Sequence, residues 1–101
     1  MSEHMRVEVI VDRPLLEEVK RIARGAGLSG HTVLAALAGE GAAGTWSEDL
    51  VTSAQSKLVF LAVTSEPKAR AFIAALEPLL DTHGLVALCS AVSVVRGAKF
   101  D

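Results

Sequence analysis

Two stretches of this chain are apolar on both faces of a β-strand, and this feature restricts the fold more than any other. In residues 57–63 (KLVFLAV), leucine, phenylalanine and alanine alternate with valine and leucine, so neither face is polar. Residues 85–95 (LVALCSAVSVV) are also apolar on both sides. Strands of this composition need a covering layer on each face. The chain must therefore supply that cover from helices, from further copies of itself, or from both.

Two further segments have the alternation of β-strands, and the first predicted helix lies between them. Residues 5–11 place three valines on one face. Asp12 is predicted to cap the helix that follows, and the glycines at 25 and 27 are predicted to end it. Residues 31–37 (HTVLAAL) predict the second strand.

A second helix is predicted to begin at Ser65 and Pro67, and Pro78 inside it predicts a kink or an early stop. The resulting order is β-α-β-β-α-β. It predicts an α+β, ferredoxin-like fold: an antiparallel four-stranded sheet with two helices on one face. The other apolar face is left uncovered, which predicts an oligomer whose sheets pack together.

Composition places this chain among single-domain globular proteins, spanning residues 1–101. Half of the residues are hydrophobic and 22% are charged, which excludes disorder as the default. A net charge of −2 without a basic cluster excludes nucleic acid as a partner. The N-terminus is polar and no apolar run is long enough for a bilayer, so a cytoplasmic protein without membrane insertion is expected. Lone Cys89 is predicted to be a small buried hydrophobe in a reducing compartment.

The segment 38–56, of 19 residues, has no periodicity and is expected to form a long loop without regular structure. Loops of this length are generally functional or disordered. It contains Trp46, the only tryptophan, and Gly39 and Gly41, where the backbone can approach a ligand closely.

Neither catalysis nor metal binding has a clear pattern in this sequence. The four residues His4, His31, His83 and Cys89 lack the spacing that fixes a metal shell. The acids have no matched base, so no catalytic residue is proposed and an enzyme is not expected. Taken alone, His31 is more often a packing residue, and Arg96 can be a side chain that only extends its charge to solvent at a strand end.

The order and spacing of five short segments resemble the PII signal-transduction superfamily. These segments are GLSGHTV (27–33), the long loop, FLAVTSEP (60–67), THG (82–84) and VVRGAKF (94–100). The chain is most similar to the PII-like branch associated with bicarbonate transport and carboxysomes. The resemblance implies a homotrimer with an adenine nucleotide in each cleft between neighbouring subunits.

The resemblance also implies roles for individual residues. Adenine and ribose are expected at the start of the second strand and the end of the third, and the phosphates at the glycine-rich loop root. The turn before the last strand and the basic residue after it are expected to come from the partner subunit. The segment 38–56 corresponds to the flexible T-loop, which would dock onto a membrane transporter or a carboxysome-associated protein. The nucleotide-binding candidates are Gly30, His31, Thr32, Val63, Gly39, Gly41, His83, Gly84, Arg96 and Lys99, and the partner-binding candidates are Trp46, Glu48 and Asp49.

Departures from the family pattern refine the expected ligand. Family members place a Lys and an Arg in the loop root, where this chain has Glu40 and Ala43, and Leu85 stands where a Lys is frequent. With fewer cations for the phosphates, AMP and ADP are expected to bind better than ATP, with cyclic AMP a further alternative. The chain has no tyrosine, so uridylylation of a loop tyrosine is excluded. The vacated space predicts room for bicarbonate.

Three other classes share this order of elements and stay open at the sequence level. They are a small ferredoxin-like enzyme that forms dimeric barrels, such as an oxygenase or isomerase, an ACT-like amino-acid-binding module, and a structural trimer without a ligand. The long segment between the second and third strands favours the PII-like interpretation over all three.

Overall fold

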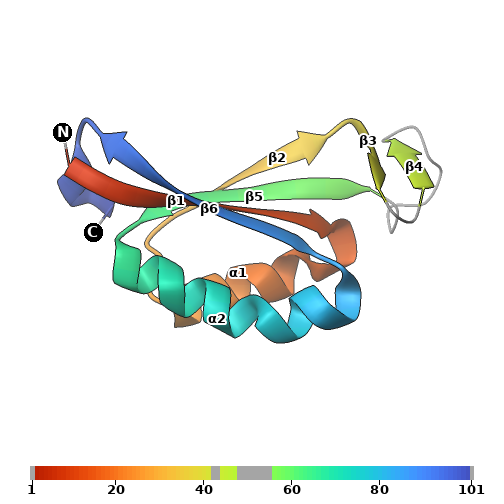
Figure 1. The fold of residues 1–101 in the computed structure, drawn as a ribbon, viewed down its shortest axis with the longest axis horizontal. Helices are drawn as coiled ribbons and strands as arrows, with labels where there is room; N and C mark the ends of the chain where they lie inside the picture. Colours follow the sequence, from red (N-terminus) through yellow and green to blue (C-terminus); the bar gives the residue numbers. More distant parts are fainter. Residues whose placement is uncertain (1, 42–43, 48–55, 101) are drawn as a thin grey trace.

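The predicted α+β, ferredoxin-like arrangement is confirmed in a computed structural model that describes residues 2–41, 44–47 and 56–100. Four antiparallel strands form one sheet in the order β2-β5-β1-β6, and both helices lie on one face of it (Figure 1). The main elements are β1 (Ser2–Asp12), α1 (Leu16–Gly25), β2 (Thr32–Ala36), β5 (Lys57–Thr64), α2 (Glu66–His83) and β6 (Val86–Val94). Two short 3-10 turns, Arg13–Leu15 and Gly97–Phe100, follow β1 and β6.

The core lies between the sheet and the two helices. Along β5 the side chains alternate strictly between buried and half-buried, because every second residue faces the helices. Phe60 and Phe72 are fully buried at its centre, with ring centroids 5.7 Å apart. The surrounding aliphatic side chains include Val7, Val9, Val11, Val19, Leu58 and Leu76.

The sheet face opposite the helices is uncovered in the single chain, and β2 and β6 expose large apolar side chains on it, as the sequence predicts. The inner strand β1 adds the Arg6–Glu8 ion pair to the same face. Leu34 and Val86 are each 48% exposed, and Leu88 is 53% exposed. The strand pairing places all three on this open face: Leu88 lies opposite Glu8, and Val86 lies opposite Ile10. Side chains of this size are seldom left in water over several strands unless a partner covers them.

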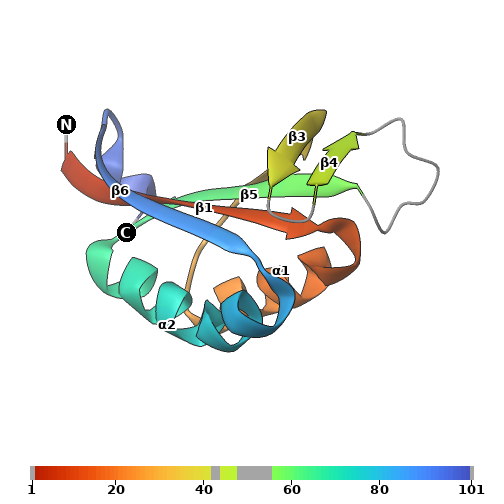
Figure 2. The same cartoon turned by 45° about the vertical axis from the view of Figure 1, so that its right-hand side comes forward.

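The segment expected to lack regular structure contains a short hairpin. Strands β3 (Ala38–Gly41) and β4 (Gly44–Ser47) form a separate two-stranded sheet. Figure 2 shows this hairpin on the side of the main sheet that faces away from the helices. Gly44, with φ 113°, adopts a conformation that few other residues tolerate, and it lies opposite Gly41. The expectation of a structureless segment is therefore wrong for 38–41 and 44–47, where Gly41 and Gly44 pair with each other across the hairpin.

Asp12 does not cap a helix, contrary to the sequence-based expectation. It is the last residue of β1, no side-chain hydrogen bond caps the 3-10 turn that follows, and α1 begins only at Leu16. Its carboxylate instead accepts a hydrogen bond of 2.6 Å from Lys57 on β5. The strand partner across the sheet offers a stronger, charged donor than a backbone N–H at the helix start.

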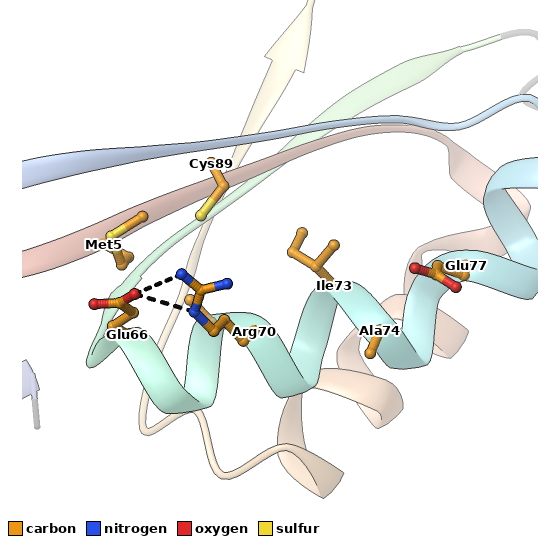
Figure 3. A pocket seen from close by; sticks show the side chains of 8 residues that line it. Met5, Glu66, Arg70, Ile73, Ala74, Glu77 and Cys89 are labelled. Atoms are coloured by element: carbon orange, nitrogen blue, oxygen red, sulfur yellow. Dashed lines mark hydrogen bonds and ion pairs between the residues drawn. The ribbon is translucent and has the colours of Figure 1, made fainter.

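Cys89 is exposed, so its predicted burial is also wrong. It lies opposite Val7 and therefore faces the helix layer, but β6 is an edge strand and α2 does not cover it fully. Its side chain lines a groove of about 320 Å³ with Met5, Ile73 and the ion-paired Glu66 and Arg70 (Figure 3). Apolar sequence does not guarantee burial at a sheet edge.

Helix α2 runs through Pro78 without stopping, so an early stop is excluded. Proline lacks the N–H that would bond to the carbonyl of Ala74, and this loss costs up to about 3 kcal/mol in a helix interior. We expect Pro78→Ala to raise the free energy of unfolding by about 1–3 kcal/mol in urea denaturation at fixed protein concentration.

Pro67 provides the matched control for this substitution. It lies in the first turn of α2, where a missing N–H leaves no helical bond unmade. Pro67→Ala should change stability by less than about 0.5 kcal/mol. Equal effects of the two substitutions would show that Pro78 places no strain on the helix.

Candidate functional site

The antiparallel order of the strands divides the candidate residues between two ends of the sheet. One end, called here the termini end, holds the start of β2 and the ends of β5 and β6, with both chain termini beside it (Figure 1). The other, called here the hairpin end, holds the ends of β1 and β2, the β3–β4 hairpin and the turn from α2 into β6. The termini end carries Gly30, His31, Thr32, Val63, Arg96 and Lys99, and the hairpin end carries Gly39, Gly41, His83 and Gly84.

At the termini end, an exposed imidazole is held against the core. The ring of His31 stacks on Phe60, with centroids 4.9 Å apart and planes 23° apart. His31 thus has the packing contact that a purely structural role requires, although the residue as a whole is exposed. Its neighbours Gly30 and Thr32 are also exposed, and Val63 is half-buried on the open face.

Arg96 lies at the same end of the sheet, after the other edge strand, and the 3-10 turn that follows it packs against β1. Arg96 follows β6, whose last residue, Val94, pairs with Ser2, and it is exposed. Lys99 is in the 3-10 turn that comes next. β2 and β6 are the two outer strands, so His31 directly precedes one edge strand and Arg96 follows the other.

At the hairpin end, the turn from α2 into β6 carries one candidate histidine and one candidate glycine. Gly84 ends α2 in the left-handed conformation, with φ 65°. Next to it, His83 Nδ1 lies 2.7 Å from the hydroxyl of Thr82, whose Oγ1 also donates to the carbonyl of Pro78 at 2.8 Å. Gly39 pairs with Trp46 in the hairpin. Glu48 and Asp49, the other partner-binding candidates, lie outside the described residues.

Lys57 is a further candidate cation for the phosphates, and the sequence pattern alone did not identify it. It is the first residue of β5, directly after the long segment, and its ammonium contacts Asp12 Oδ1 at 2.6 Å. Its position at the return of a glycine-rich loop was the signal available in the sequence. The hairpin end therefore carries the ammonium of Lys57, which is already paired with the carboxylate of Asp12.

The residues that the resemblance assigns to the partner subunit flank β6. His83 and Gly84 precede this strand and Arg96 follows it, and its nine residues span about 26 Å at about 3.3 Å per residue. The turn at Gly84 and Arg96 of one chain therefore belong to opposite ends of the sheet.

Nothing in the described ranges points to a metal centre or a membrane segment. Within residues 2–41, 44–47 and 56–100, no three His, Cys, Asp or Glu side chains are grouped so that they could hold a metal ion. Over the same ranges, no helix combines the length and the apolar character needed to cross a membrane.

The family model described as "Nitrogen regulatory protein P-II" matches residues 4–99 of this chain. The chain belongs to the P-II family. This is a family of signalling proteins, and the PII-like interpretation of the sequence is therefore confirmed. Comparison with curated protein sequences gives no significant match.

Solved structures of P-II relatives have the same fold. CPII from Thiomonas intermedia K12, bound to ADP, AMP and bicarbonate, is 20% identical with a TM-score of 0.89, over 98% of this chain and 94% of that one. A putative PII-like signalling protein from Thermus thermophilus is 22% identical with a TM-score of 0.84, over 98% and 96%. The GlnK–ATP complex of B. subtilis is 16% identical with a TM-score of 0.66, over 100% and 94%.

Proposed function

We propose that this P-II chain is a cytoplasmic signalling protein, without catalytic activity, that binds adenine nucleotides in clefts between the subunits of a homotrimer. The observation that carries the proposal is the division of the candidate residues between two opposite ends of the sheet, in a chain that matches the P-II family over residues 4–99. Two similar proteins were solved with adenine nucleotides, CPII with ADP and AMP and GlnK with ATP.

The proposed cleft joins the hairpin end of one subunit to the termini end of its neighbour. The open apolar face, with Leu34, Val86 and Leu88, supplies the contact that holds the sheets together. The hairpin end would place Gly39, Gly41 and the turn at Gly84 beside the phosphates, where backbone N–H groups are available. The neighbour would contribute the ring of His31, which stacks on Phe60, and the guanidinium of Arg96.

A short phosphate chain fits the charge of this cleft better than a long one. ATP carries about four negative charges, and partly buried phosphates need cations to offset their lost hydration. Glu40 is exposed on β3, where relatives carry a cation, and Lys57 is already paired with Asp12. AMP and ADP are therefore the proposed ligands.

We further assign a carbon-sensing role to the same cleft. CPII, which has a similar fold, was solved with bicarbonate beside its nucleotides. A small anion beside AMP or ADP would occupy the space of the terminal phosphates, and residues 38–56 would report it to a bicarbonate transporter or a carboxysome-associated partner. The dimeric-barrel enzyme and the ACT-like module gain no specific support, because neither accounts for a P-II match over residues 4–99.

Calorimetric titration with AMP, ADP, ATP and cyclic AMP tests the proposed ligand class. We expect AMP and ADP to bind at least about tenfold more tightly than ATP, since the deficit of one or two cations is felt most by the longest phosphate chain. No binding of any of the four nucleotides would contradict the function itself, and preferred binding of ATP would contradict the charge argument.

Bicarbonate added to the AMP- or ADP-loaded protein then tests the sensing role. Trp46 is the only tryptophan, so its fluorescence reports the segment 38–56 directly. At fixed pH and ionic strength, bicarbonate should change this fluorescence and the nucleotide affinity, whereas chloride should change neither. An unchanged signal in both measurements would leave nucleotide binding intact and remove the carbon-sensing role.

A further inference from the structure

An ion pair between Asp12 and Lys57 lies at the root of the segment 38–56. Asp12 ends β1 and Lys57 begins β5, and the two residues are directly opposite each other in the sheet. Their contact of 2.6 Å is partly shielded, since the lysine side chain is 29% exposed and the aspartate side chain 38%. A backbone hydrogen bond of 3.0 Å from Arg13 to the carbonyl of Ser56 continues the pairing by one step and holds both strands in this register.

Both ends of the segment meet at Lys57. The segment leaves the main sheet just after Ala36, which is the partner of Lys57 on β2, and it returns at Ser56. Asp12, Ala36 and Lys57 all lie on the open face, because their neighbours Val11 and Leu58 are buried under the helices. The β3–β4 hairpin projects from the same side (Figure 2). The pair therefore lies at the same end and on the same side of the sheet as the strand that carries Gly39 and Gly41, where the phosphates are proposed to bind.

We infer that Asp12 is a specificity-determining residue, which selects against highly charged ligands by holding the ammonium of Lys57. This inference rests on the proposed function. While the pair is intact, the loop root offers no net positive charge from these two residues. A ligand phosphate that recruits Lys57 must displace the Asp12 carboxylate and then remain within a few ångströms of that negative charge.

The size of this effect depends on the charge of the ligand. A partly exposed ion pair of this kind adds little stability by itself, so Lys57 can be released. The repulsion between Asp12 and the ligand, however, grows with each negative charge that approaches. The penalty is largest for ATP and smaller for ADP. It is smallest for AMP, because its one phosphate lies farthest from the position that the third phosphate of ATP would occupy. Asp12 would thus neutralise the cation at the loop root, and the site would therefore prefer ligands with short phosphate chains.

The test compares the ATP:AMP affinity ratio of four proteins by calorimetry at one ionic strength. Asp12→Asn keeps an oxygen acceptor for Lys57 but removes the negative charge, so ATP should bind about tenfold more tightly and AMP less than about twofold. Lys57→Gln should lower the ratio. The double variant Asp12→Asn, Lys57→Gln should return it close to that of the parent, because the pair is neutral as a unit.

Glu17→Gln is the matched control. It also removes one negative charge from an ion pair, here with Lys20 at 3.0 Å, but on α1 in the opposite layer. Glu17→Gln should leave the ATP:AMP affinity ratio unchanged. This control separates an effect of the charge at position 12 from an effect of the net charge of the protein.

The outcomes distinguish this inference from the proposed function. If the parent binds AMP or ADP and Asp12→Asn has the same ATP:AMP ratio as Glu17→Gln, the inference is wrong and the function stands. If the parent binds no adenine nucleotide, both are wrong. Circular dichroism and light scattering of each variant confirm that fold and assembly are retained.

Discussion

Subunits carrying Arg96→Ala and subunits carrying Gly41→Val should regain ADP binding when they are co-expressed, although neither variant binds well alone. Removing a charged donor to a phosphate costs about 1.5–3 kcal/mol, so Arg96→Ala should weaken ADP roughly ten- to hundredfold. A Cβ added at Gly41 meets no described atom within 4 Å, and valine suits a strand. Gly41→Val should therefore leave the chain folded while its side chain blocks the approach of the phosphates.

The restoration follows from the two ends of the sheet. Each cleft would take its loop root from one subunit and its Arg96 from the next, so a random mixture contains about a quarter of clefts with both parts intact. Calorimetry of the mixed trimer should show this fraction of sites at the affinity of the parent. If both residues served a cleft within one subunit, co-expression would restore no site, and the head-to-tail arrangement would be wrong.

Leu88→Lys should convert the assembled protein into monomers. Leu88 is 53% exposed on the open face of the single chain, so the fold itself tolerates a polar side chain there. A lysine at this position also lies opposite Glu8, which is favourable in the monomer. In a packed interface the same ammonium would be desolvated, at a cost of several kcal/mol for each ion.

Light scattering measures the mass, and 10.6 kDa is the mass of one chain. Ala71→Lys, at an exposed position of α2, is the matched control and should leave the assembly intact. The monomeric Leu88→Lys protein should also lose ADP binding, because its two half-sites no longer meet. A parent protein that is itself monomeric at micromolar concentration would contradict the packing of the open faces, whatever the behaviour of the variant.

The order of elements could be predicted from the sequence because it depends on local periodicity. Alternation in residues 57–63 indicates a strand whatever surrounds it, and the helix after Ser65 has its apolar stripe within its own turns. The uncovered apolar face also follows from sequence, since two helices cannot cover both sides of four strands. The structure confirms these predictions, and the P-II match confirms the family that the motifs indicated.

The predictions that failed concern contacts between residues distant in the chain. The capping role of Asp12 was assigned from its neighbours, but Lys57, 45 positions away, is the stronger partner once β1 and β5 pair. Burial of Cys89 was inferred from an apolar run, but exposure depends on whether its strand lies inside the sheet or at its edge.

The sequence by itself determined the elements, their order and the types of side chain available to a ligand. Only the tertiary structure decided which of these residues share an end of the sheet. His83 and Arg96 are 13 positions apart in the chain, yet β6 runs extended between them and carries them to opposite ends. Strand direction and pairing order are global properties, set by the packing of the whole sheet against its helices, and local patterns cannot encode them. For that reason the sequence supplies the candidate residues, and the fold places them at two opposite ends of one sheet.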